Sequence, residues 1–182
     1  MLPTKLYHYS EIPIKRLRKN FYEKRGGFYF EHSKPTGLWV SVEDYEEDQN
    51  WYTWCKENEF RLPSLKHKYL VNIKKNAKML YLSTEKEIED FGIQYQANDQ
   101  NEFDKYVRRL GREPYRYVYQ IRWEEVKTLW DGIIISPYNW KCRHSPSTEW
   151  YYGWDCASGC IWNVEAIKNY KLEAILEEKE EC

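Results

Sequence analysis

The chain has 182 residues, enough for one domain with a sizeable core, and 28 basic against 29 acidic residues give a net charge of −1. This balance excludes nucleic-acid binding through a global positive field, so any such site must be a local patch. No apolar run approaches the length of a membrane span and the N-terminus has no hydrophobic signal core, so we expect a cytoplasmic protein without a membrane partner. Aromatic residues make up 18% of the chain, with nine Trp and seventeen Tyr, and these side chains stack on bases and other rings.

The first expected element is a short strand over Leu6–Ser10. Alternation along a strand places His8 and Ser10 on one face and Tyr7 and Tyr9 on the other. Two hydrogen-bonding side chains on one face can hold a polar ligand such as a ribose. The alternative is that His8 has only a structural role.

The stretch 34–54 combines a turn, a strand and a helix. Lys34–Gly37 has turn chemistry, Leu38–Ser41 favours a strand, and a helix should carry Trp51 and Trp54 on one face. We expect the acidic run between them to form the first turn of that helix, through Glu43, Asp44, Glu46, Glu47 and Asp48. Strand and helix would form two walls of a slot for a flat ring, or else pack ordinary core aromatics.

The remaining elements alternate without a regular βαβ pattern and without an internal repeat or linker. A capping box of Thr84 and Glu87 predicts a helix from Glu85, and a polar loop is expected at Ser145–Thr148. Further helices are expected over 103–110 and 123–129, and strands over 68–73, 79–82, 133–135, 160–162 and 166–172. The pattern predicts a single α+β domain over 1–182, ending in an acidic tail from about 173 to 182.

Two segments interleave basic and aromatic residues, Lys15–Arg25 and Arg108–Arg122, and would suit a phosphate backbone and bases or form plain solvated surface. Cys156 and Cys160, with Cys142 and His144 upstream, could be imagined as zinc ligands. No close Cys-x-x-Cys pair supports such a site, so we expect no metal and reduced thiols.

The order of these motifs resembles the ADP-ribosyltransferases, in particular the diphtheria-toxin and poly-ADP-ribose-polymerase branch with its His-Tyr-Glu constellation. His8-Tyr9-Ser10 is similar to that branch's opening His-x-Ser strand. Gly37-Leu38-Trp39-Val40-Ser41 is similar to its Gly-Ile-Tyr-Phe-Ala strand, and Trp51 lies near the place of the aromatic that stacks on nicotinamide. The resemblance implies split antiparallel β-sheets with a few flanking helices and NAD as the substrate.

The resemblance also implies the roles of individual residues. The implied NAD contacts are His8, Tyr9, Ser10, Gly37, Trp39, Ser41 and Trp51. The family's last strand starts with a catalytic Glu, whereas Ala157, Ser158 and Gly159 stand before the expected strand here. Asp155 is therefore the first candidate for the catalytic acid and Glu149 the second, with His8 as their partner.

The expected function is that of a mono-ADP-ribosyltransferase that modifies a macromolecule, with nucleic acid favoured over protein as the acceptor. A small transferase of this kind suits a toxin or effector, which an antitoxin could accompany. One alternative is a non-catalytic, aromatic-rich module that binds single-stranded nucleic acid. Another is an NAD-dependent RNA 2′-phosphotransferase-like enzyme, although no His-x-x-x-Arg arrangement follows Ile135.

Overall fold

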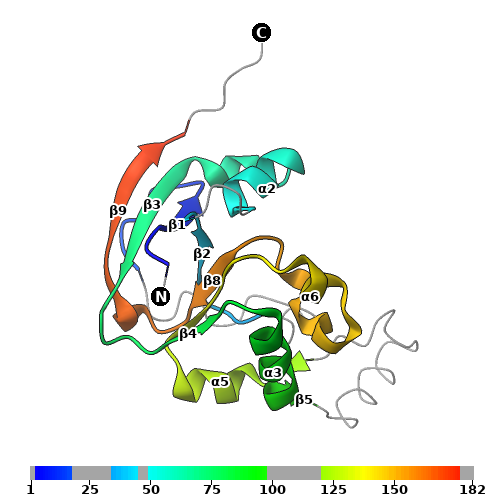
Figure 1. The fold of residues 1–182 in the computed structure, drawn as a ribbon. Coiled ribbons are helices and arrows are strands. Elements are labelled where there is room, and N and C mark those ends of the chain that lie inside the picture. The colour runs from blue at the N-terminus through cyan, green and yellow to red at the C-terminus, as the bar shows by residue number, and fades with distance from the viewer. Residues whose placement is uncertain (1–2, 18–33, 45–48, 98–119, 177–182) are drawn as a thin grey trace, which may run out of the picture.

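The computed structural model describes residues 3–17, 34–44, 49–97 and 120–176, and its main feature is one seven-stranded sheet (Figure 1). The strand order in that sheet is β4-β7-β8-β2-β1-β3-β9. Its strands are β1 (Leu6–Ser10), β2 (Leu38–Val42), β3 (His67–Ile73), β4 (Met79–Leu82), β7 (Gly132–Ile135), β8 (Ser158–Ile161) and β9 (Ile167–Ile175). The α+β class is therefore confirmed.

The sheet is mixed, which differs from the expected split antiparallel sheets. β4 and β7 are parallel, and the other neighbouring strands are antiparallel. The pairing between β1 and β2 is short. These strands share only the pairs Leu6–Val42 and Tyr7–Ser41, whereas β2 and β8 share four residue pairs. The halves β9-β3-β1 and β2-β8-β7-β4 are thus joined at a narrow point.

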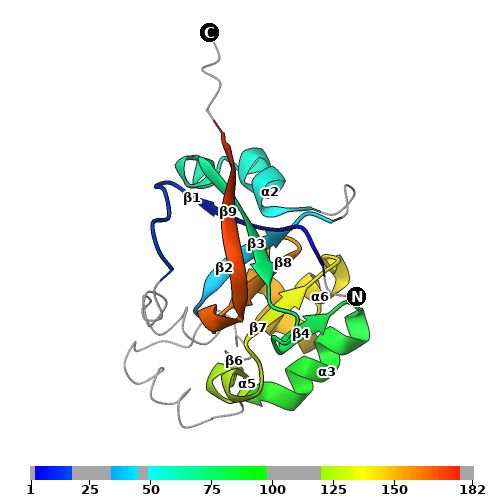
Figure 2. The same cartoon turned by 90° about the vertical axis from the view of Figure 1, so that its left-hand side faces the viewer.

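The helices gather at the two ends of this sheet. α2 (Trp51–Glu57) lies beside the end formed by β1 and β3, whereas α3 (Glu85–Tyr95), α5 (Trp123–Leu129) and α6 (Trp140–His144) lie around β4 and β7 (Figures 1 and 2). The smaller elements are the 3-10 helices η1 (Leu62–Leu65), η2 (Pro146–Gly153) and η3 (Val164–Ala166), and a two-stranded sheet of β5 (Gln96–Ala97) and β6 (Gln120–Ile121). No helix in the described ranges has both the length and the apolar character needed to cross a bilayer.

The starts of α3 and α2 can be compared with the helix starts predicted from local sequence signals. The capping box at Thr84 and Glu87 is present in both directions, so that prediction is confirmed. The predicted acidic first turn of α2 is wrong, because the helix begins at Trp51 with Asn50 as its cap and no acid in its first turn. Glu43 and Asp44 instead bond residues near the N-terminus: Glu43 accepts from the Tyr9 hydroxyl, and Asp44 accepts from the backbone of residues 4 and 5.

Two predictions for the last third are also corrected. Ser145–Thr148 is not simply a loop, because the 3-10 helix η2 starts at Pro146. The tail does not begin at 173, because β9 continues to Ile175 through its pairing with β3. The predicted helix over 103–110, most of both basic–aromatic segments and the tail beyond 176 lie outside the described residues.

Three of the tryptophans that pack against the half of the sheet formed by β2, β8, β7 and β4 are buried core residues. Trp150, Tyr151 and Trp154 of the η2 region are at most 1% exposed, and Trp123 of α5 is 3% exposed. They form one cluster with the buried side chains of β2, β7 and β8. The high aromatic content is therefore explained in large part by packing.

Gly92 lies in the middle of α3, where glycine normally destabilises a helix by about 1 kcal/mol relative to alanine. Here a Cβ would lie 2.7 Å from Nε1 of Trp150, which is buried and has no hydrogen-bond partner in the described residues. The glycine therefore makes room for the indole.

We expect Gly92→Ala to lower the free energy of unfolding by about 1–3 kcal/mol, the usual range for overpacking a core. Trp150→Phe removes the indole nitrogen without breaking a hydrogen bond, so Gly92→Ala should cost less in that background. Chemical denaturation of the four proteins of this double-mutant cycle measures the difference. Equal costs in both backgrounds would contradict the proposed steric contact.

Candidate functional site

His8 lies where β1 and β2 part. Tyr7 is the last residue of β1 that pairs with β2, and beyond it Nδ1 of His8 lies 2.8 Å from the carbonyl oxygen of Trp39. A carbonyl oxygen only accepts, so we assign the proton to Nδ1. Burial lowers the pKa of His8 below 6.5, although the bond to Trp39 partly opposes this. The ring is therefore neutral at pH 7, and Nε2 has a lone pair that can accept a hydrogen bond.

Trp39 is half-buried on β2, on the opposite face from Leu38 and Val40. Its indole contacts Trp154 edge-on, with ring centroids 4.9 Å apart. Nζ of Lys34 lies 5.3 Å from the ring centroid, so a cation covers part of this aromatic surface. A flat ligand would have to displace the lysine in order to stack there.

Ser41 shares the face of Trp39 and links it to α2. Its hydroxyl oxygen accepts from the backbone N–H of Trp51 at 2.9 Å, so α2 starts over this face. The Trp51 indole stacks on Trp54, with centroids 5.3 Å apart, and meets Phe60 edge-on. Trp39 and Trp51 therefore lie on one side of the sheet, with different ring partners and no ring contact between them; the nicotinamide clamp remains a prediction.

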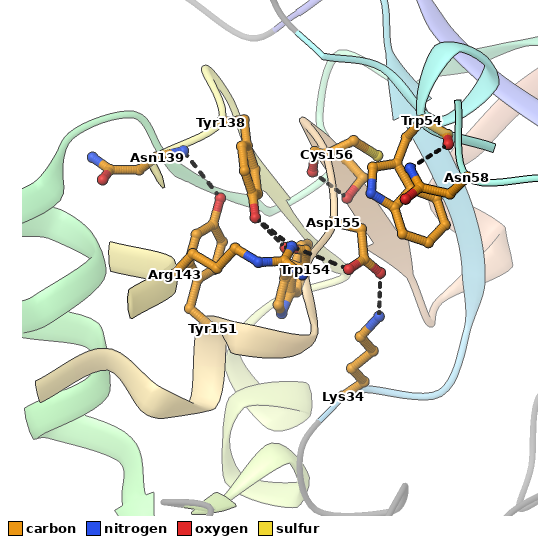
Figure 3. Close-up of polar contacts among 11 residues, drawn as sticks. Lys34, Trp54, Asn58, Tyr138, Asn139, Arg143, Tyr151, Trp154, Asp155 and Cys156 are labelled. Carbon is orange, nitrogen blue, oxygen red and sulfur yellow. Dashed lines mark hydrogen bonds and ion pairs between the residues drawn. The ribbon is translucent and has the colours of Figure 1, made fainter. Parts of the chain in front are cut away.

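Asp155 directly follows Trp154, the residue that contacts Trp39, and lies between two cations (Figure 3). Oδ1 is 3.1 Å from Nη1 of Arg143, and Oδ2 is 3.8 Å from Nζ of Lys34. Burial lowers the pKa of Lys34, and the Asp155 charge opposes that shift. The same lysine thus connects the candidate acid with the candidate stacking ring. Glu149, the second candidate, is half-buried near the start of η2.

The other sequence candidates have contacts inside the fold. The Tyr9 hydroxyl donates to Glu43 at 2.6 Å, and burial, followed by this bond, raises its pKa. The Ser10 hydroxyl donates to the carbonyl of Ile12 at 2.9 Å. At Gly37 a Cβ would lie 2.6 Å from the carbonyl oxygen of Ile161, so close packing explains this glycine. Their roles in NAD binding remain predictions.

Sequence reasoning missed the residues that surround Asp155. Arg143 donates to the Tyr138 hydroxyl at 2.7 Å and to the Trp154 carbonyl at 3.0 Å, as well as to Asp155. It lies on α6, which was not predicted. The available signal was Asn139, whose side chain caps that helix by accepting from the backbone of Cys142.

The described residues contain no group of three or more His, Cys, Asp or Glu side chains that could hold a metal ion. Cys55, Cys142, Cys156 and Cys160 are free, buried thiols. Burial raises the pKa of Cys55 and Cys142 to about 11, so these thiols are protonated and unreactive at pH 7.

The chain matches no family model, no curated protein and no solved structure. Its chemistry must be inferred from the arrangement itself. That arrangement comprises a neutral imidazole with an acceptor nitrogen, a half-buried indole on the neighbouring strand, and a carboxylate between two cations.

We expect His8 to titrate below 6.5 and to keep its proton on Nδ1, which ¹⁵N chemical shifts of the imidazole would report. A depressed folded-state pKa means that the unfolded chain takes up this proton first as pH falls. The stability from His8 is therefore complete above 6.5 and is lost as pH falls through the folded-state pKa. His8→Asn, which can still donate to Trp39 but does not titrate, should remove this part of the pH dependence; an unchanged profile would contradict the assignment.

Proposed function

We propose that this protein transfers ADP-ribose from NAD to a macromolecular acceptor. The observation that carries the proposal is His8, whose Nδ1 is committed to the Trp39 carbonyl so that Nε2 can accept from a ribose hydroxyl. That contact is to the backbone of Trp39, whose indole lies on the face of Ser41 and Tyr7, so the hydrogen-bonding group and the stacking ring come from two neighbouring strands at the joint between β1 and β2. Binding of a nucleotide-linked ribose and a flat ring requires this pair of features.

Each group has a distinct task in the proposed reaction. Breaking the bond between nicotinamide and ribose passes through a cation-like transition state, as in glycoside chemistry. His8 would hold a ribose hydroxyl and Trp39 would stack on nicotinamide. Asp155 would stabilise the positive charge on the sugar and orient or deprotonate the acceptor.

Displacement of Lys34 would allow Asp155 to contact the ligand. Arg143 holds Oδ1 of the carboxylate, whereas Lys34 is at a longer distance from Oδ2 and also covers Trp39. A lysine side chain is flexible, so a bound dinucleotide can displace it from both partners at once. Oδ2 would then face the ligand while Arg143 keeps the carboxylate oriented.

We also propose that the fold is related to that of the ADP-ribosyltransferases. The support is the order of the motifs along the chain and the narrow joint between β1 and β2, which divides the sheet into two halves. The parallel pair β4–β7 is a difference from the purely antiparallel arrangement expected from that family.

The decisive experiment is incubation of the protein with NAD labelled on the adenylate and with cell lysate. Label that becomes attached to a macromolecule, and is released by nuclease or by protease, would establish transfer and identify the acceptor class. Release of free nicotinamide without attached label would indicate hydrolysis alone. Absence of both products would refute the proposal.

We expect His8→Ala to weaken NAD binding or turnover at least about tenfold, which is the loss of one good hydrogen bond to the ligand. His67→Ala is the control, because His67 also bonds a backbone carbonyl across the sheet, that of Ser10, but is not itself among the implied NAD contacts. Calorimetric titration with NAD and melting temperatures separate binding from folding. Unchanged NAD binding in a folded His8→Ala protein would exclude His8 as a ligand.

Asp155→Asn should reduce transfer by about 10² or more, the range for loss of an acid–base group, with NAD binding nearly intact. Glu149→Gln should have a milder effect, because Asp155 is the carboxylate beside Lys34 and Trp39. Single-turnover rates at saturating NAD measure both variants. The opposite ranking would assign the acid to Glu149, and full activity in both variants would refute the carboxylate mechanism.

A further inference from the structure

Two large aromatic rings are exposed on the surface formed by α6 and η2, which we call the α6–η2 surface. Trp140 is 55% exposed and Tyr152 is 43% exposed. Each has a neighbour that fixes its orientation: Tyr138 meets Trp140 edge-on at 4.8 Å, and His144 meets Tyr152 edge-on at 6.4 Å. Exposed rings in defined orientations can stack on flat ligand groups.

A cation that uses only some of its hydrogen-bond donors lies beside these rings. The guanidinium of Arg143 is 5.1 Å from the centre of the Tyr152 ring. All of its hydrogen bonds, to Tyr138, Trp154 and Asp155, are made by Nη1. Within the described parts of the chain, Nη2 and Nε have no hydrogen-bond acceptor, so most of the donors of Arg143, whose side chain is 16% exposed, are unused there.

Lys34 adds a second cation with unused donors, and it lies on the other side of Asp155 from Arg143 (Figure 3). Its ammonium is 3.8 Å from Asp155, which is an ion pair but not a hydrogen bond. Two cations therefore share one carboxylate, and each lacks hydrogen-bond acceptors that partly buried charges require. By contrast Lys141, on the same surface, already pairs with Glu85 at 3.4 Å. A phosphate would supply both the missing charge and the missing acceptors.

We propose that the α6–η2 surface binds single-stranded nucleic acid, with bases stacked on Trp140 and Tyr152 and phosphates on Arg143 and Lys34. Exposed rings favour a single strand over a duplex, because paired bases do not offer their faces for stacking. The role of this surface as the acceptor site of an enzyme rests on the proposed transfer reaction. The strand would then reach Asp155, which Arg143 and Lys34 both contact.

The rings are tested with a fluorescently labelled, mixed-sequence oligonucleotide of about 15 nucleotides, comparable to the site sizes of small single-strand-binding folds. Fluorescence anisotropy should show that Trp140→Ala and Tyr152→Ala each weaken binding about tenfold, and that Tyr152→Phe, which keeps the ring, does not. Leu129→Ala is the control, because Leu129 is 50% exposed on α5. Circular dichroism verifies the fold of each variant.

The cations are tested through salt dependence. Lys34→Gln should lower the slope of log K against log salt by about one, the contribution of a single phosphate contact. Lys86→Gln removes a lysine that is likewise paired with an aspartate, Asp90 at 2.8 Å, but lies on α3 and should leave the slope unchanged.

The inference is overturned if the wild-type protein does not bind the oligonucleotide, if it binds a duplex of the same sequence equally well, or if the two alanine variants bind like wild type. His8→Ala separates this inference from the proposed function. That variant should bind the oligonucleotide normally, since His8 is not part of the α6–η2 surface. Oligonucleotide binding without any use of NAD by the wild-type protein would support the surface and refute the transferase.

Discussion

The joint between β1 and β2 is the constraint on which the arrangement of the site depends. Only two residue pairs connect these strands, and beyond them the Trp39 carbonyl accepts a hydrogen bond from the His8 ring. A carbonyl left without any donor in this partly buried position would cost about 1–3 kcal/mol. A donor at position 8 avoids this cost, and the histidine that supplies it keeps Nε2 as an acceptor.

Strands, and the helix with a local cap, could be predicted from sequence because their signals lie within a few residues. Alternation identified β1, and Thr84 with Glu87 identified the start of α3. The acidic run before α2 was misinterpreted because two of its carboxylates serve distant partners. Asp44, for example, bonds residues about 40 positions away in the chain. Asn50, which forms a specific hydrogen bond at the helix start, was the stronger local signal.

The residues of the candidate site likewise fall into two groups: those that local sequence patterns indicate and those that only tertiary contacts reveal. His8, Trp39 and Ser41 could be proposed as candidates because their strands are short and regular. The structure places the His8 ring on the Trp39 carbonyl and pairs Ser41 with Tyr7 at the β1–β2 joint. Lys34 and Arg143 were missed because their importance comes from a contact with Asp155, which no periodicity encodes. Their presence changes the surroundings of Asp155, since its carboxylate is held in place by Arg143 on one oxygen and lies near Lys34 on the other.

The packing of the tryptophans has an optical consequence. Trp39, Trp154, Trp150, Trp123 and Trp162 form a continuous series of indoles with neighbouring centroids 4.9 to 6.4 Å apart. At such separations excitation energy migrates between the rings faster than it is emitted. Trp39, which is half-buried like Trp162 at the other end and lies beside the candidate site, therefore exchanges excitation with the whole series. A ligand that stacks on this one ring would quench far more of the protein's intrinsic fluorescence than the share of a single tryptophan.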